Sequence, residues 1–238
     1  MTDIPAEEKV RNLFNQWAEA GHGEEMEAHH LPITRPMLSQ MDIKPDNRIL
    51  DIGCGSGWLC RLLARLVPEG RVVGVDVAPE MVRRAKAVST DYANLNFMEG
   101  AADRIPCGEG SFGKIVSVES AYYWPDPAVC LREMFRVLDK GGTAWILINY
   151  YRENPHAHQW GAIIDVPTHL YSADEWMSFC TEAGFVDVQR RQIPDPTPVP
   201  EDYSGRWFRD AEQMRKFHQV GALLVHGTKK KATMAAES

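Results

Sequence analysis

The chain has 238 residues, of which 44% are hydrophobic and 25% charged, and its formal net charge is −7 at pH 7. This composition is typical of a globular protein with one large or two small domains, and it argues against the basic surface that nucleic-acid binding requires. No apolar run approaches the ~20 residues of a membrane span, and the N-terminal residues show no signal-peptide pattern.

The first forty residues are predicted to be helical. Apolar side chains recur at helical spacing over residues 10–17, which indicates one buried stripe. The glycine-rich residues 21–23 interrupt the pattern, and a second helical segment follows over about 24–41. Because this segment contains Pro32 and Pro36, we expect it to be kinked or split.

From residue 48 onward, predicted strands and helices alternate. The strands are expected at 48–52, 71–76, 95–98, 114–118, 143–148, 185–190 and 219–225. The helices are expected at 57–67, from 79 to about 88, at 126–138 and at 172–182, the last with a capping box that starts at Ser172. This alternation predicts an α/β fold, a doubly wound sandwich with a mainly parallel sheet and helices on both faces. Ligands of such sheets bind beyond the carboxyl ends of the strands.

Residues 48–59 are the most informative segment of the chain. They read RILDIGCGSGWL, which predicts a buried strand, a glycine-rich turn and the start of a helix. Glycine tolerates positive φ and lets a ligand approach bare backbone at a helix N-terminus. The next predicted strand ends at Asp76, where an acid can bind both hydroxyls of a ribose. The two features together predict a nucleoside site.

The glycine spacing indicates which nucleoside is bound. A dinucleotide fingerprint requires a third glycine at position 58, which is Trp58 here, so the pattern is G-x-G-x-G rather than G-x-G-x-x-G. Residues 51–57 resemble motif I of the class I S-adenosylmethionine (SAM) dependent methyltransferases. Three further segments resemble the same family in the same order, at 99–106, 111–127 and 132–142. The resemblance covers about residues 30–190 and is strongest to the small bacterial enzymes of the ubiquinone/menaquinone-biosynthesis type.

The resemblance implies a Rossmann-like, seven-stranded sheet whose last strand is antiparallel, with SAM as cofactor and S-adenosylhomocysteine (SAH) as product. It also implies that the methionine and ribose parts of SAM contact Asp51, Gly53, Cys54, Gly55, Ser56 and Gly57. Asp76 would bind the ribose, Val77 and Met81 would pack on the adenine, and Val118 would face the cofactor. In the family segment that meets the adenine amino group, Ala102 and Asp103 match the family, whereas Ala101 replaces the usual acid. Either Asp103 takes the place of that acid, or the adenine is held by backbone alone. Arg35 is a candidate partner for the methionine carboxylate, with an exposed surface position as the alternative.

Methyl transfer from a sulfonium needs alignment of two reactants, and a general base only where the acceptor must lose a proton. Glu119, just after the fourth strand, is the first candidate, and Tyr123 and His30 are the others. The alternative roles are an acid that orients the cofactor for Glu119, a ring packed in the core for Tyr123 and a surface position for His30. We also expect one of Tyr150 and Tyr151 in the acceptor pocket. No histidine has a recognised metal-ligand spacing, so no metal site is predicted.

The sequence therefore predicts a SAM-dependent methyltransferase that transfers a methyl group to an O, N or C atom of a small-molecule acceptor. We expect one domain over 1–228, with an N-terminal helical lid (1–45), a SAM-binding core (46–150) and an acceptor-side segment (151–228), followed by a disordered tail (229–238). The five scattered cysteines favour reduced thiols in a cytoplasmic protein. The expected partner is the small-molecule acceptor, and no nucleic acid or membrane span is expected. The protein itself is expected to be a monomer or a homodimer. A SAM-binding regulatory protein without turnover is the alternative, and Trp58 argues against a nicotinamide-dependent oxidoreductase.

Overall fold

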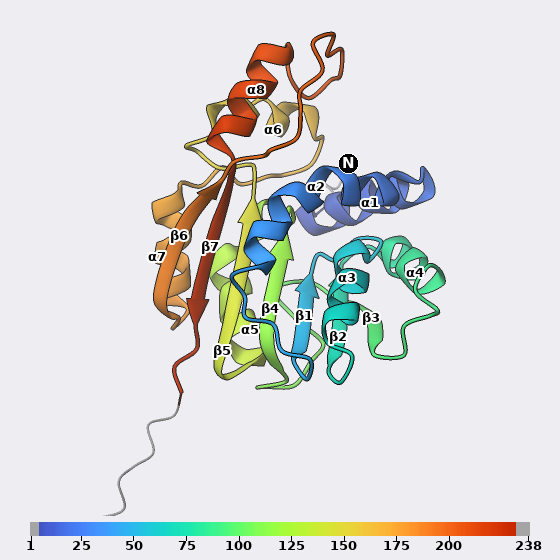
Figure 1. Cartoon of the computed structure of the whole chain (residues 1–238), viewed down its shortest axis with the longest axis vertical. Coiled ribbons are helices and arrows are strands. Elements are labelled where there is room, and N and C mark those ends of the chain that lie inside the picture. The colour runs from blue at the N-terminus through green and yellow to red at the C-terminus, as the bar shows by residue number, and fades with distance from the viewer. Residues whose placement is uncertain (1–4, 232–238) are drawn as a thin grey trace, which may run out of the picture.

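The computed structural model describes residues 5–231, apart from the side chains of Gly23 and Glu24. Its centre is a seven-stranded sheet in the order β3-β2-β1-β4-β5-β7-β6 (Figure 1). The strands are β1 (Arg48–Ile52), β2 (Arg71–Asp76), β3 (Leu95–Glu99), β4 (Phe112–Val118), β5 (Leu138–Ile148), β6 (Val186–Ile193) and β7 (Ala222–Thr228). Strands β1 to β5 pair in parallel, whereas β7 is antiparallel to both of its neighbours. The predicted doubly wound α/β sandwich with an antiparallel last strand is confirmed.

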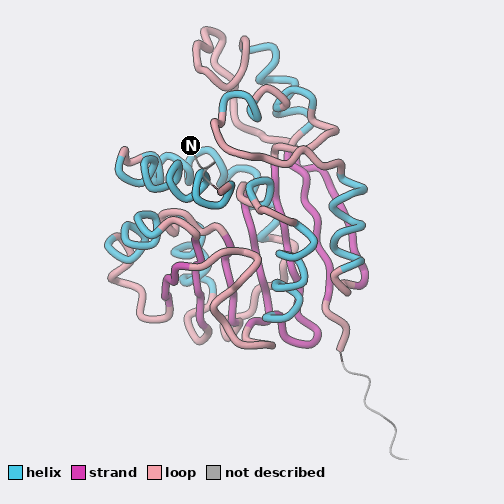
Figure 2. Tube along the Cα trace, turned by 180° about the vertical axis from the view of Figure 1, so that it is seen from behind, coloured by secondary structure: helices cyan, strands magenta, loops and turns pink. Residues whose placement is uncertain are grey.

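The part of the chain that the structure describes forms eight α-helices (Figures 1 and 2). They are α1 (Ala6–Glu19), α2 (His22–Leu38), α3 (Trp58–Leu66), α4 (Pro79–Ala87), α5 (Pro127–Val137), α6 (Trp160–Ile163), α7 (Ala173–Glu182) and α8 (Ala211–Val220). Of these, α2, α3 and α4 pack on one face of the sheet and α5 and α7 on the other, while α1, α6 and α8 lie above its upper edge. Successive strand side chains point to opposite faces, so Ile49 and Val116 join the core beneath α2, α3 and α4. Their neighbours Leu50 and Ile115 join the core on the side of α5 and α7.

Helix α1 is attached to the rest of the fold through a small hydrophobic cluster of its own. Ala18, with Phe14 and Trp17 packed beside it, contacts Ala78 and Met81 at the start of α4. In Figure 1, α1 and α2 lie above the arrowheads of the central parallel strands. The N-terminal helices therefore cover the edge of the sheet at which ligands of this fold class bind.

Helix α2 runs without interruption from His22 to Leu38, so it is not split at its two prolines, Pro32 and Pro36. Ile33 and Met37 on this helix are fully buried in the core shared with α3. The burial of these side chains offsets the cost of the backbone hydrogen bonds that the prolines remove.

The predicted start of the last strand, at residue 219, is wrong, because α8 occupies Ala211–Val220 and β7 begins at Ala222. Asp210 caps α8 by accepting a hydrogen bond from the Gln213 N–H at 2.7 Å. Gly221 ends the helix at a φ of 79°. Most residues of this helix are polar, so the apolar pattern does not indicate it. Its last two residues, Gln219 and Val220, therefore fall within the predicted strand.

The predicted disordered tail also begins too early. Lys229 is buried, and its ammonium donates hydrogen bonds to the carbonyl oxygens of Phe135 at 2.7 Å and Leu138 at 2.8 Å. The last carbonyls of a helix lack intrahelical donors, and a lysine commonly supplies them. Lys229 thus caps α5 as part of the fold, while residues 232–238 lie outside the described residues.

Candidate active site

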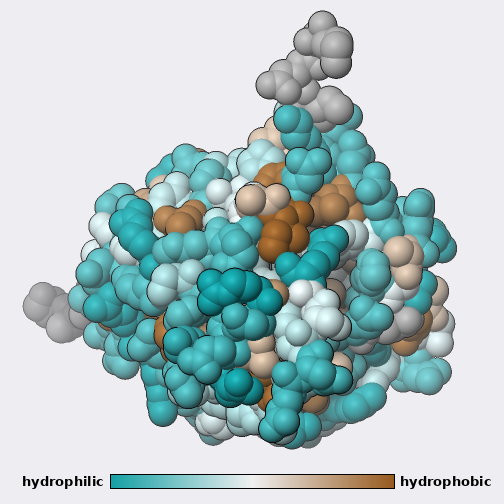
Figure 3. Space-filling view, turned by 90° about the horizontal axis from the view of Figure 1, so that it is seen from above, coloured by the Kyte–Doolittle hydropathy of each residue, from teal (hydrophilic) through white to brown (hydrophobic). Residues whose placement is uncertain are grey.

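A cavity of about 270 Å³ lies at the carboxyl edge of the sheet, beneath α1 and α2. Viewed from above, this end of the molecule is mostly hydrophilic, with apolar residues gathered near its centre (Figure 3). The predicted site residues that line the cavity are His30, Gly53, Cys54, Gly55, Ser56, Asp76, Val77, Met81, Ala102, Val118, Glu119 and Tyr123. The fold therefore brings most of the sequence-predicted site together in one place.

The turn after β1 contributes the consecutive residues Gly53 to Ser56 to the cavity wall. The N–H groups of Gly53 and Cys54 both donate to the Val75 carbonyl, at 2.8 and 3.1 Å. Gly53 has a φ of 74°, and a Cβ there would lie 2.3 Å from the Ser120 Oγ. Only glycine fits this position, because the backbone is left-handed and Ser120 fills the space that a side chain would need.

Asp76 ends β2 as an oriented acceptor. It is 7% exposed, and its Oδ2 accepts from the Gly55 N–H at 2.8 Å while Oδ1 accepts from the Ala78 N–H at 2.9 Å. Burial nevertheless raises the pKa of this carboxyl. Each carboxylate oxygen has a second lone pair, so Asp76 can accept hydrogen bonds from a ribose diol in the cavity.

Four predicted cofactor residues lie outside the cavity wall. Asp51 is buried behind it, where the Cys60 thiol donates to its Oδ2 at 3.2 Å and burial raises the pKa of Asp51 to about 7. Gly57 starts α3 and packs against the core, and the Oδ1 of Asp103 is buried without a hydrogen-bond partner among the described residues. Arg35 is exposed, so its proposed pairing with a carboxylate in the cavity is not supported. It sits on the solvent side of α2 because its neighbours Ile33 and Met37 face the core.

Glu119 follows β4 directly and places a second buried carboxyl in the cavity wall. It is 9% exposed, and its φ of 54° is unusual for a residue other than glycine. The Oε1 accepts from the Asn149 N–H at 2.5 Å, and Oε2 accepts from the Tyr122 hydroxyl at 3.3 Å. Burial raises the pKa of Glu119 to about 8 despite these two donors. A carboxyl with this pKa is mostly protonated at pH 7, and both of its oxygens have a hydrogen-bond donor.

Aromatic rings from α1, from the start of α3 and from the loop after β4 form another part of the wall. They are Phe14, Trp17, Trp58, Tyr123 and Trp124. The rings of Phe14 and Tyr123 meet edge to face at 5.1 Å, which joins α1 to the loop after β4. The expectation of Tyr150 or Tyr151 in the wall is not met, because both are buried in the core beside α5 and α7.

Three histidines line the cavity, of which the sequence indicated one. Burial, with a contribution from the neighbouring charge of His29, lowers the pKa of His30 to about 4, so its imidazole is neutral at pH 7. His22 and His169 were missed, and His156 and His158 do not line the cavity. The His169 backbone N–H donates to the Tyr122 carbonyl at 2.8 Å. This contact spans 47 positions, so no local sequence pattern could have revealed it.

The cavity wall contains three carboxyl groups and, among the described residues, no permanent cation. Glu7, Asp76 and Glu119 line the cavity, whereas no Lys or Arg does so among the described residues. Glu7 is paired with Arg11 at 3.1 Å and with Arg104 at 3.2 Å. Within residues 5–231 no group of three or more His, Cys, Asp or Glu side chains has an arrangement suited to a metal ion.

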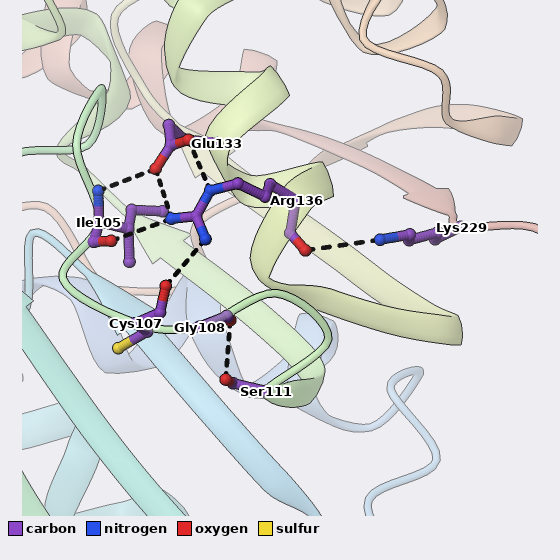
Figure 4. A network of polar contacts seen from close by, with 7 residues as sticks. All are labelled: Ile105, Cys107, Gly108, Ser111, Glu133, Arg136 and Lys229. Carbon is purple, nitrogen blue, oxygen red and sulfur yellow. Dashed lines mark hydrogen bonds and ion pairs between the residues drawn. The ribbon is translucent and has the colours of Figure 1, made fainter.

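A side-chain clamp supports the loop that follows the cavity residues Gly100 to Ala102 (Figure 4). Arg136 and Glu133 on α5 form a bidentate pair with both contacts at 2.7 Å. The Arg136 guanidinium also donates to the carbonyls of Cys107 and Ile105, and Glu133 accepts from the Ile105 N–H at 3.1 Å. The i, i+3 spacing of Glu133 and Arg136 is the one local sign of this clamp.

Comparison with known proteins agrees with this geometry. Residues 50–146 match the family described as "Methyltransferase domain". The chloroplastic 2-methyl-6-phytyl-1,4-hydroquinone methyltransferase of Arabidopsis thaliana is 30% identical over 63% of this chain and 43% of its own length. The ubiquinone biosynthesis O-methyltransferase of Xanthomonas campestris is 31% identical over 58% of each chain. The matches therefore span only about half of these curated relatives.

The similarity to one solved structure is more extensive. A methyltransferase solved in complex with the Trm112 methyltransferase activator of Haloferax volcanii is 32% identical, with a TM-score of 0.84 over 91% of this chain and 97% of that one. The chain belongs to the class I SAM-dependent methyltransferases, and SAM is its cofactor. Among its relatives are methyltransferases named for quinone biosynthesis. The turn residues Gly53 to Ser56 and the oriented Asp76 carboxyl lie in the wall of the same cavity. No helix within residues 5–231 is long and apolar enough to cross a membrane.

Proposed function

We propose that the chain transfers the methyl group of SAM to an uncharged, ring-containing small molecule. One observation carries the proposal: a single cavity joins the glycine-rich turn and Asp76 to a wall of aromatic rings, with Glu119 also in that wall. The named activities of the relatives, one on a hydroquinone and one in ubiquinone biosynthesis, support a ring-containing acceptor.

SAM supplies a methyl group that is already activated for transfer, so the chain mainly positions it. The turn from Gly53 to Ser56 is suited to hold the amino-acid part and Asp76 the ribose, while Val77 and Met81 are placed beside them in the same wall. Holding both reactants in line contributes most of the rate in such displacements. The remaining chemistry depends on the acceptor-side residues.

The acceptor side is suited to an apolar ring that carries a hydroxyl. The rings of Phe14, Trp17 and Tyr123 supply apolar walls, and His30 supplies a neutral imidazole for a hydrogen bond. In its ionised form, Glu119 can receive the hydroxyl proton as the methyl group arrives. This assigns Glu119 the role of general base, with Tyr123 and His30 as acceptor-binding groups.

The cofactor assignment can be tested by calorimetry with SAM, SAH and NAD on the wild-type chain and on Asp76→Ala. We expect SAM and SAH to bind, NAD not to bind, and Asp76→Ala to weaken both affinities by about 10–100-fold, since it removes charge-assisted hydrogen bonds. Asp165→Ala, at an exposed carboxylate, is the control and should bind normally. Binding of NAD alone, or of none of the three, would contradict the proposal.

Turnover is then screened with ring-containing hydroxyl compounds, using a labelled methyl group and mass spectrometry to locate it. The assays are run with the chain alone and with the Trm112 activator, because the similar methyltransferase was solved in complex with that protein. Tight SAM binding without turnover under either condition would favour a regulatory protein instead.

A further inference from the structure

We propose that Glu119 releases its proton when SAM binds and takes one up when the methyl group has been transferred, so that its charge distinguishes SAM from SAH. This inference rests on the proposed function, because it requires SAM in the cavity of Glu119. It adds a role that the cofactor and acceptor assignments do not contain.

The first argument is the position of Glu119 next to the glycine-rich turn. Ser120, the next residue, fills the space beside Gly53 and donates its hydroxyl to the Ile52 carbonyl at 2.9 Å. The Glu119 backbone N–H donates to the Leu147 carbonyl at 2.8 Å. The carboxyl is thereby fixed in the same wall as the turn suited to the amino-acid end of SAM.

The second argument is the absence of a countercharge among the described residues of the wall. No Lys or Arg side chain lines the cavity, and the groups that contact the Glu119 carboxyl are the Asn149 N–H and the Tyr122 hydroxyl. The other titratable groups of the wall are Asp76 and Cys54 on the turn side, and Glu7, His22, His30, Tyr123 and His169 on the acceptor side. None of these is a permanent cation. SAM and SAH both bring an ammonium group with their amino-acid part, and SAM alone adds the cationic sulfonium.

Burial holds the pKa of Glu119 at about 8, so the carboxyl is mostly neutral at pH 7 in the empty protein. A positive charge in the same cavity favours the carboxylate. SAH shares the ribose, adenine and amino-acid groups of SAM but has a neutral thioether. The two molecules therefore differ in the one property to which this carboxyl responds.

The same change prepares Glu119 for catalysis on a hydroxyl acceptor. The acceptor oxygen forms a bond to the methyl carbon while the bond from that carbon to sulfur breaks, and the hydroxyl proton passes to the Glu119 carboxylate. The sulfonium becomes a thioether, so its positive charge disappears as Glu119 becomes neutral. Product release then leaves the protonated side chain of the empty protein.

Calorimetry in two buffers of different ionisation enthalpy measures the protons released at pH 7. We expect SAM binding to release about 0.5–1 proton more than SAH binding. Glu119→Gln should abolish the difference between SAM and SAH. Glu7→Gln should retain it, because Glu7 already has two guanidinium partners. Equal proton release with SAM and SAH, or a full difference in Glu119→Gln, would overturn the inference.

A second measurement uses only the wild-type chain. Below pH 8 SAM must displace a proton and SAH need not, so the ratio of SAM to SAH affinity should rise between pH 6 and 8, by at most about tenfold per pH unit. The ratio should level off above pH 8. A ratio that is constant with pH, while both molecules bind, would overturn this inference alone. Failure of both molecules to bind would overturn the cofactor assignment as well.

Discussion

The two halves of the cavity are built in different ways. The cofactor half consists of short segments at the ends of β1, β2 and β3, among them the turn from Gly53 to Ser56, Asp76 and the residues Gly100 to Ala102. The acceptor half consists of side chains from α1, α2, the loop after β4 and the segment around His169. The first half depends on the conformation of one turn, whereas the second depends on how distant elements pack together.

Because of this difference, substitutions in the two halves should affect different properties of the protein. A change in the turn alters backbone that the sheet itself holds, so it affects stability and cofactor affinity together. A change in α1 alters a helix attached through the small cluster around Ala18, Ala78 and Met81. We expect such a change to affect acceptor binding while most of the sheet and its cores remain intact.

The largest effect is expected for Gly53→Ala, in the cofactor half. The new Cβ would meet the Ser120 Oγ at 2.3 Å with a φ of 74°, so left-handed strain and overlap should together cost about 2–4 kcal/mol. If the turn opens to relieve the overlap, SAM affinity should fall by about 100-fold. Chemical denaturation and calorimetry with SAM measure the two effects.

Gly55→Ala is the matched control for this substitution. Its φ is 51°, but a Cβ there has no atom within 4 Å, so the free energy of unfolding should fall only by the backbone strain of about 1 kcal/mol. Equal losses in the two variants would show that left-handed backbone alone, rather than the approach of Ser120, makes Gly53 necessary.

The same division explains how much the sequence could predict. The turn, Asp76 and the order of strands are local patterns, because strand, glycine spacing and terminal acid lie within 29 consecutive residues. Their prediction required only propensity and the rule that parallel strands end at one edge. The capping box at Ser172 was likewise predicted and is present.

For the acceptor half, the sequence could indicate which segments approach the cavity but not which of their side chains line it. His22 and His169 line the cavity through tertiary packing, and Lys229 was assigned to a tail because its carbonyl partners lie more than 90 positions away. Arg35 was selected for its position before β1, but the helical phase of α2 turns it to solvent. In each case the missing information was the relative orientation of elements that are distant in sequence.

Trp17→Ala should separate the two halves of the cavity, with a smaller effect than the glycine variant. Trp17 belongs to the cluster that attaches α1 and also lines the cavity. We expect the KM for the acceptor to rise by about 10–30-fold as apolar wall area is lost, while SAM affinity changes by less than about threefold. Gln16→Ala, exposed on the same helix, should behave like wild type. A loss of SAM affinity as large as the rise in acceptor KM would show that α1 serves both halves equally.

The smallest effect is expected at the clamp on α5, which acts on the cofactor half from a distance. Arg136→Met removes the donors to the Cys107 and Ile105 carbonyls, and this side chain is 37% exposed, so water can replace part of what is lost. SAM affinity should fall by about 3–5-fold, with kcat unchanged, because the loop after Ala102 becomes less well positioned.

Arg136→Lys keeps the charge but not the planar fork, so it should resemble Arg136→Met rather than wild type. Arg132→Ala, exposed one turn earlier on the same helix, is the control. If Arg136→Met lowers the melting temperature and leaves SAM affinity unchanged, the clamp stabilises α5 without positioning the cofactor loop.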